Sequence, residues 1–154
     1  RRHTRLLTVT GVQTCALPIL KPGEKFVING AVVVNADRRT SLLIQNKVSI
    51  LREKDVMLPG EANTPVKRIY FDVMMMYLND TEHDQYMPAF TQRMTEFMEA
   101  ISNRDALQKC VSIAEDVTAR RYYAALMTCK KLMPFEKERL EYVAPRASLS
   151  AASS

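Results

Sequence analysis

One stretch constrains the fold more than any other. Over residues 20–57, short apolar runs alternate with polar segments at the spacing of β-hairpins. Asn29-Gly30 separates two of these runs, and Asn-Gly is the strongest short hairpin signal because both residues tolerate the positive φ of a type I′ turn. The pattern predicts that Phe26 and Ile28 share one face of a strand. It places Val32 and Val34 together on one face of the next.

Two further short strands follow in the same stretch. A second turn at Asn35-Ala36-Asp37 leads to an apolar run over 42–44, and the polar segment 45–47 leads to another over 48–50. The interpretation is a meander of four short antiparallel strands. A meander of this size is marginally stable alone and must pack against another part of the chain.

The rest of the chain has helical signals. Thr64 can cap a helix and Pro65 suits its first position, where the missing N–H has no intrahelical partner in any case. Apolar residues then recur at helical spacing. We expect a second helix near Pro88, and a third that begins after Asn103 and continues until Pro134 ends it. The buried face of the first helix is predicted to contain Ile69, Val73, Met76 and Tyr77.

These elements predict an α+β fold, in which a small N-terminal antiparallel β-meander packs on a C-terminal lobe of about three helices. Residues 20–143 form one domain, with a strand-rich basic part over 20–57 and a helical part over 64–142. The small polar residues of 144–154 predict a disordered tail. Short strands with open edges also favour pairing between copies, which predicts a homodimer.

Residues 1–19 do not fit this pattern. The segment begins with basic residues and contains Leu6-Leu7, which suggests a signal peptide, but Thr8 and Thr10 interrupt the apolar part and no clean cleavage site follows. The hairpin-spaced pattern begins abruptly at Leu20. We therefore expect residues 1–19 to be a non-native segment outside the fold.

Basic residues concentrate in the strand-rich part. Residues 20–68 hold nine basic and five acidic residues, a net charge of +4, whereas residues 69–154 hold ten and twelve, a net charge of −2. Such asymmetry favours a polyanion partner on one side of the molecule, although a solvated surface can produce it too. The predicted RNA-binding residues lie at turns and on the outer face of the meander: Lys21, Lys25, Arg38, Arg39, Lys47, Arg52 and Lys54.

The sequence offers little for catalysis. Its one acid–imidazole cluster, Glu82-His83-Asp84, lies in a polar stretch that predicts a solvated loop, with Thr81 as a cap. No glycine-rich phosphate loop, zinc-ligand spacing or membrane-length apolar run is present, and Cys110 and Cys129 fit buried thiols. We expect no catalytic residue, no cofactor, no metal and no membrane partner.

The same residues resemble a known family. The segments LKPGEKFVINGAVVVN, IQNKVSILREKDVM and TPVKRIYFDVMMMYL are similar to successive blocks of the flagellum biosynthesis repressor (FlbT) family, over residues 20 to about 140. The resemblance implies a non-enzymatic cytoplasmic regulator that associates with the 5′ untranslated region of flagellin mRNA. There it lowers translation and promotes decay of the message.

A second hypothesis stays open. In it the helical lobe is an interaction module that binds flagellin or a small flagellar regulator, and the effect on the mRNA is indirect. The charge distribution favours direct RNA contact. The scarcity of aromatic side chains in the basic part weakens it, because stacking on bases would then fall to Arg38-Arg39.

Overall fold

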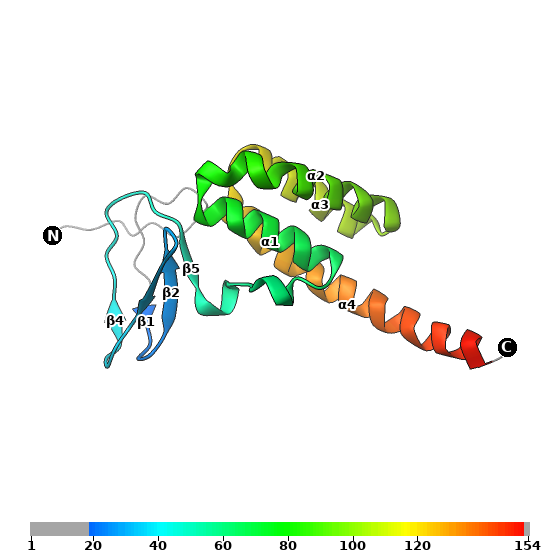
Figure 1. Cartoon of the computed structure of the whole chain (residues 1–154), viewed down its shortest axis with the longest axis horizontal. Helices are drawn as coiled ribbons and strands as arrows, with labels where there is room; N and C mark the ends of the chain where they lie inside the picture. Colours follow the sequence, from blue (N-terminus) through cyan, green and yellow to red (C-terminus); the bar gives the residue numbers. More distant parts are fainter. Residues whose placement is uncertain (1–18, 153–154) are drawn as a thin grey trace.

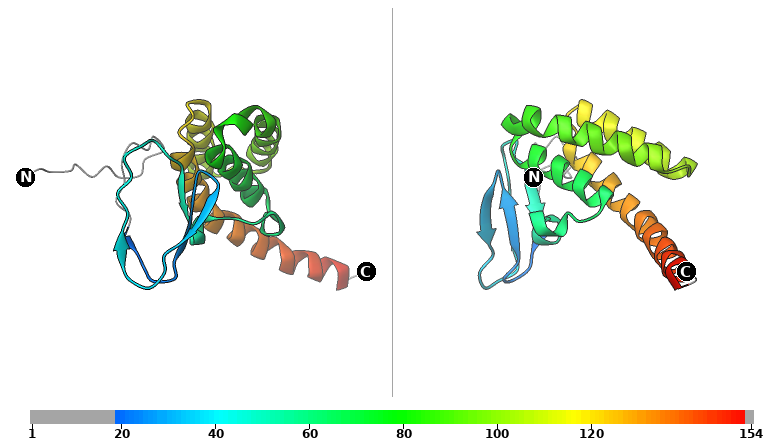
Figure 2. Two further views of the ribbon diagram at one scale, coloured as in Figure 1. Left: turned by 60° about the vertical axis from the view of Figure 1, so that its left-hand side comes forward. Right: turned by 45° about the vertical axis from the view of Figure 1, so that its right-hand side comes forward.

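The computed structural model describes residues 19–152, with side chains described for residues 19–140. In this part of the chain, five short strands lie at one end of the molecule and four helices at the other, with the last helix extending away from both (Figure 1). Figure 2 shows that the strands stand to one side of the helices. The predicted α+β class is therefore confirmed.

The strands form two small antiparallel sheets. A three-stranded sheet has the order β3-β2-β5, and a separate pair joins β1 to β4. The bounds are β1 Ile19–Leu20, β2 Lys25–Ile28, β3 Ala31–Val34, β4 Thr40–Ser41 and β5 Ile50–Arg52.

The predicted hairpin forms as expected. β2 and β3 pair with Ile28 opposite Ala31, so the turn consists of Asn29 and Gly30 alone. Both turn residues have positive φ, at 47° and 86°, the combination that a type I′ turn requires. Local sequence is sufficient here because the turn chemistry fixes the register of the two strands.

The meander prediction is wrong beyond this hairpin. The expected strand over 42–44 reduces to an isolated bridge at Ile44, and the expected strand over 48–50 begins only at Ile50. After β3 the chain pairs with β1 and then returns to the far edge of β2. The apolar side chains still pack in a small core, so burial in this segment does not require regular pairing. The core contains Leu20, Phe26 and Ile50, with Ile28, Leu42, Ile44 and Val48 packed around it.

The helices are α1 Pro65–Leu78, α2 His83–Ala100, α3 Arg104–Thr118 and α4 Tyr122–Ala152. The predicted start of α1 is confirmed, since the Thr64 hydroxyl oxygen accepts a hydrogen bond from the N–H of Lys67 at 3.3 Å. The apolar face predicted for α1 is buried. It forms the main core together with residues from α2, α3 and α4.

Three helix boundaries differ from prediction. The expected third helix is two, because the chain reverses at Arg120, whose φ is +59°, and both halves can then pack on one core. α4 continues through Pro134, since buried contacts at Leu132 and Glu136 hold the turns on either side of it. α2 begins at His83, before its predicted start near Pro88, and it includes Pro88 as an exposed residue.

The predictions for residues 144–154 and for residues 1–19 also need correction. Residues 144–152, predicted to be disordered, continue α4 as helix, because extending an existing helix is much easier than starting one. Ile19, assigned to the non-native segment, pairs with Ser41, and its carbonyl accepts a hydrogen bond from Arg52 Nη2 at 3.2 Å. The rest of that prediction, for residues 1–18, lies outside the described residues.

The strands join the helices mainly through β5. Leu51 is buried in the main core, on the opposite face of the sheet from the small core. The Tyr77 hydroxyl of α1 accepts a hydrogen bond from the N–H of Ile50 and donates one to its carbonyl, both at 3.0 Å. This one side chain thus covers the outer edge of β5. Burial raises the pKa of Tyr77 to about 12, so its hydroxyl keeps its proton at neutral pH.

Candidate nucleic-acid interface

Four of the predicted RNA-binding residues gather at one end of the three-stranded sheet. Lys21, Lys25, Arg38 and Arg39 are all exposed there, and we call this group the basic end. Its geometry depends on Asn35, the residue after β3. The Asn35 amide nitrogen lies 3.2, 2.9 and 2.7 Å from the carbonyl oxygens of Leu20, Lys21 and Arg38. An uncharged side chain therefore holds the two cationic segments side by side.

The arginines of the basic end are available for a ligand. Arg38 and Arg39 form no ion pair with any other described residue. Lys25 approaches Glu53 at 3.9 Å, but both side chains are more than half exposed, so this pair contributes little. The N–H of Lys21 donates to Glu24, and this hydrogen bond, helped by Arg52, lowers the pKa of Glu24.

The other three predicted residues lie elsewhere. Arg52 is bound to Glu24 at 2.6 Å and to the Ile19 carbonyl, which gives it a structural role. Lys54 lies in a short 3-10 helix next to Asp55, a buried residue that pairs with Lys130 of α4. Lys47 lies at the opposite end of the sheet. The structure thus separates residues that sequence spacing could not tell apart.

Lys47 borders a cleft of about 310 Å³ between the strands and the helices. Two of its lining residues, Asn29 and Arg120, are the non-glycine residues with positive φ in the described chain. Asn29 tolerates this conformation, whereas for Arg120 it costs roughly 1 kcal/mol or more. Arg120 could not be identified from the sequence, since nothing in its neighbours marks the end of a helix.

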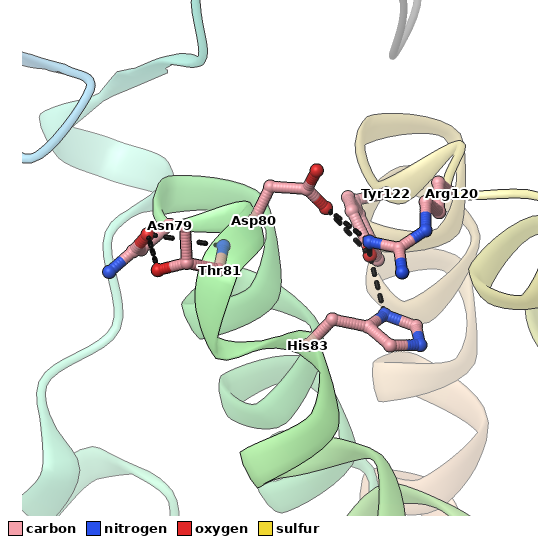
Figure 3. A network of polar contacts seen from close by, with 6 residues as sticks. All are labelled: Asn79, Asp80, Thr81, His83, Arg120 and Tyr122. Carbon is pink, nitrogen blue, oxygen red and sulfur yellow. Dashed lines mark hydrogen bonds and ion pairs between the residues drawn. The ribbon is translucent and has the colours of Figure 1, made fainter.

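Arg120 is held by a polar network that joins the α1–α2 connection to the α3–α4 connection (Figure 3). Its guanidinium donates to Asp80 at 2.7 Å, and the Tyr122 hydroxyl lies 3.2 Å from the same carboxylate. His83 Nδ1 lies 2.6 Å from the Tyr122 hydroxyl. Because Asp80 neutralises Arg120, the cleft gains no free cation from it. The basic end is therefore the stronger anion-binding candidate.

This network corrects the expectation for Glu82-His83-Asp84. His83 is half-buried at the start of α2 and contacts Tyr122, so it is not in a solvated loop. The cap of the short 3-10 helix Asp80–Glu82, which precedes α2, is Asn79. Its side-chain oxygen accepts hydrogen bonds from the N–H and hydroxyl of Thr81. Thr81 donates to the cap and does not itself provide it.

Replacing Tyr122 with phenylalanine should lower the free energy of unfolding by about 1–2 kcal/mol, because its hydroxyl joins both turns and is largely buried. Burial raises the pKa of this hydroxyl to about 12, with Arg120 acting against the rise and Asp80 adding to it. Urea denaturation measures the change. Tyr123→Phe is the control, since its hydroxyl has no hydrogen bond within residues 19–140 and its loss should stay below about 0.5 kcal/mol. Equal losses for the two variants would contradict a structural role for the network.

The described residues show no sign of a metal site or of a membrane span. The described residues contain no group of three or more His, Cys, Asp or Glu side chains placed to hold a metal ion. Over the same residues, no helix combines the length and apolar character needed to cross a membrane. Cys110 and Cys129 are buried free thiols, and burial raises the pKa of Cys110 to about 11.

Comparison with known proteins gives consistent matches. The family model described as "Flagellar protein FlbT" matches residues 19–140. The flagellum biosynthesis repressor protein FlbT of Caulobacter vibrioides (strain ATCC 19089 / CIP 103742 / CB 15) is 51% identical over 129 residues, covering 84% of this chain and 92% of that protein. A probable flagellum biosynthesis repressor protein FlbT of Caulobacter sp. (strain K31) is 53% identical over 124 residues, covering 80% and 95%. One from Rhodopseudomonas palustris (strain TIE-1) is 38% identical, covering 79% and 94%. No solved structure matches.

Proposed function

The chain belongs to the FlbT family of flagellar proteins, and from this membership we propose that it represses flagellum biosynthesis by associating with the 5′ untranslated region of flagellin mRNA. Bound there, it lowers translation and promotes decay of the message. The role is regulatory and needs no catalytic group. It takes place in the cytoplasm, where the message is translated.

The basic end carries this proposal. Lys21, Lys25, Arg38 and Arg39 come from segments far apart in the sequence, and Asn35 brings them together. Clustered cations neutralise neighbouring phosphates and release condensed counterions, which is the main source of affinity for nucleic acid. The exposed arginines can also contact a phosphate with two parallel hydrogen bonds.

The side chains at the basic end fit single-stranded RNA with little base stacking. Phe26, the aromatic residue of the strand-rich part, is 2% exposed and cannot serve as a stacking surface. Arg38 and Arg39 are left to stack on bases through their guanidinium planes. We therefore expect strong salt dependence and modest preference between sequences, so that a partner or the shape of the leader RNA adds to the specificity.

Replacing Arg38 and Arg39 with alanine should lower RNA affinity about tenfold at ~0.1 M salt, for the flagellin leader and for an unrelated RNA alike. The slope of log affinity against log salt should shrink by roughly 1.4, from about 0.7 for each lost single-strand phosphate contact. Stability should change little, because both side chains are exposed in a turn. A gel-shift titration of the full chain at several salt concentrations measures both quantities.

The matched control is Arg104→Ala with Lys131→Ala. It removes the same charge from exposed positions in the helical part. Lys130 is unsuitable as a control because it pairs with the buried Asp55. If the control variant loses as much affinity as the arginine variant, net charge alone is responsible. If the control alone loses affinity, the RNA surface lies on the helices.

The interaction-module alternative has one observation in its favour. A groove of about 620 Å³ between the start of α1 and α4 has Met133, Pro134 and Leu140 on its lining, with Lys67 among its charged residues. Such a groove suits an apolar segment of flagellin or of a small flagellar regulator. This alternative holds if the full chain binds flagellin and neither the arginine variant nor the control variant loses RNA affinity.

A further inference from the structure

β3 is an edge strand with an unusual surface. It lies at the outside of the order β3-β2-β5, and all of its residues are exposed. Val32, Val33 and Val34 are 69%, 37% and 53% exposed. Edge strands of monomeric proteins are normally protected by charges, proline, bulges or a covering segment. The residues of β3 include no charge and no proline, whereas the opposite edge, at Ile50, is covered by Tyr77.

The register shows which backbone groups of β3 face outward. The two-residue turn makes Ile28 and Ala31 a hydrogen-bonded pair, and the alternation of an antiparallel ladder then directs the groups of Val33 toward β2. The hydrogen bond from the Asn35 N–H to the Glu24 carbonyl, at 2.9 Å, follows the same alternation. The N–H and C=O groups of Val32 and Val34 therefore point away from the sheet, and no described residue outside it bonds to them.

We propose that β3 pairs with β3 of a second copy of this chain, antiparallel and about a twofold axis at Val33. In this register Val32 of each copy faces Val34 of the other. Every outward N–H and C=O of these residues then meets a partner group, and the two sheets become one. The strand is self-complementary in this arrangement, as an interface with twofold symmetry requires.

The charges near β3 favour a second copy as the occupant. The nearest cation, Lys25, lies opposite Val34 on the inner strand, so only valines meet across the new boundary. Antiparallel pairing places the two basic ends at opposite ends of the joined sheet, where they do not repel one another. Parallel pairing would set them side by side. β3 also has no cation that could neutralise an RNA phosphate.

The size of the contact sets the expected affinity. A pair of four-residue strands buries much less than the roughly 1,200–2,000 Å² of a stable interface, so the dimer should dissociate in the micromolar range. The three-stranded sheet is itself marginal in size, and extending it across the axis adds cross-strand valine pairs on both faces.

Sedimentation velocity of the full chain, from about 1 to 300 µM, tests the proposal. Wild type should change from monomer to dimer over this range, and Val32→Lys should raise the dissociation constant at least tenfold. Val111→Lys, the same change at an exposed valine of α3, should leave it unaltered. A wild type that stays monomeric throughout, or a Val111→Lys variant that dissociates equally, overturns the proposal.

Two further variants keep the test independent of folding effects. Val34→Pro removes only an outward N–H and leaves the ladder with β2 intact, so it too should weaken the dimer at least tenfold while circular dichroism stays unchanged. Val33→Cys, in a Cys15→Ser background, places two thiols across the axis at a non-hydrogen-bonded position, where Cα atoms lie about 4.5 Å apart. Oxidation should then yield a covalent dimer that Val32→Cys does not form. Equal cross-linking by both cysteine variants overturns the register.

Discussion

Replacing Glu136 with alanine should lower the free energy of unfolding by about 2–4 kcal/mol, a large effect for one side chain far from the candidate site. Glu136 of α4 is 6% exposed, and its two oxygens accept hydrogen bonds from the Thr64 hydroxyl at 2.5 Å and the Val66 N–H at 2.9 Å. Its charge also lies at the positive end of the α1 dipole. Alanine would leave the buried Val66 N–H and the partly buried Thr64 hydroxyl without this acceptor.

Urea denaturation monitored by circular dichroism measures this change. Glu138→Ala is the matched control, because it removes the same carboxylate two residues away from an exposed position, and its effect should stay within about 0.5 kcal/mol. Glu136→Gln keeps one acceptor oxygen and should fall between the two. Equal stability of the Glu136→Ala and Glu138→Ala variants would show that α1 does not depend on α4 for its cap.

The second large effect is expected at Asp72, which is 2% exposed on α1 and paired with Arg93 of α2. Arg93 Nη1 lies 2.6 Å from each carboxylate oxygen. Replacing Arg93 with alanine leaves the carboxylate buried and uncompensated, and this should lower the free energy of unfolding by about 2–3 kcal/mol at pH 7. The Arg93 side chain is 38% exposed, which places the expected loss below that of a fully buried pair.

The loss at Arg93 should depend on pH. Burial raises the pKa of Asp72, and Arg93 acts in the opposite direction. A carboxyl whose pKa is raised on folding favours the folded state below the unfolded pKa, about 4, and loses that contribution as pH rises through the folded pKa. Without Arg93 the pKa rises further, so the difference from wild type should grow between pH 4.5 and 7.5.

Denaturation at several pH values measures this dependence. Arg121→Ala is the control, since its pair with Asp116 lies at the surface and should contribute less than about 1 kcal/mol. The double variant Asp72→Asn with Arg93→Ala should recover part of the loss, because it removes the unpaired charge. A loss that is constant with pH would mean that Arg93 acts through packing alone.

Features with local causes were predictable from the sequence. The hairpin at Asn29-Gly30 and the start of α1 at Thr64-Pro65 each follow from the conformational preferences of two neighbouring residues. The reversal at Arg120 and the passage of α4 through Pro134 were not predictable in this way. Contacts with distant parts of the chain decide both, through Asp80 in one case and through Thr64 and Val66 in the other.

The candidate site was predictable in the same limited way. Charge and turn signals correctly placed Arg38 and Arg39 at the surface. They could not show that Arg52 is already paired with Glu24, because the two residues meet only when β5 lies beside β2. Nor could they show the role of Asn35, whose amide donates a hydrogen bond to the carbonyl of Leu20, 15 residues earlier.

The cap that Glu136 provides for α1 affects the order in which parts of the chain can fold during synthesis. All the strand pairings lie within residues 19–52, so they can begin to form early during synthesis, before the helices that stabilise the sheet are complete. The first turn of α1 receives its buried acceptor from a residue 70 positions after Val66. A ribosome must therefore translate almost the whole segment matched by the family model before this helix is fully capped. Until then the nascent chain carries a marginally stable sheet beside a helix that is still incompletely fixed.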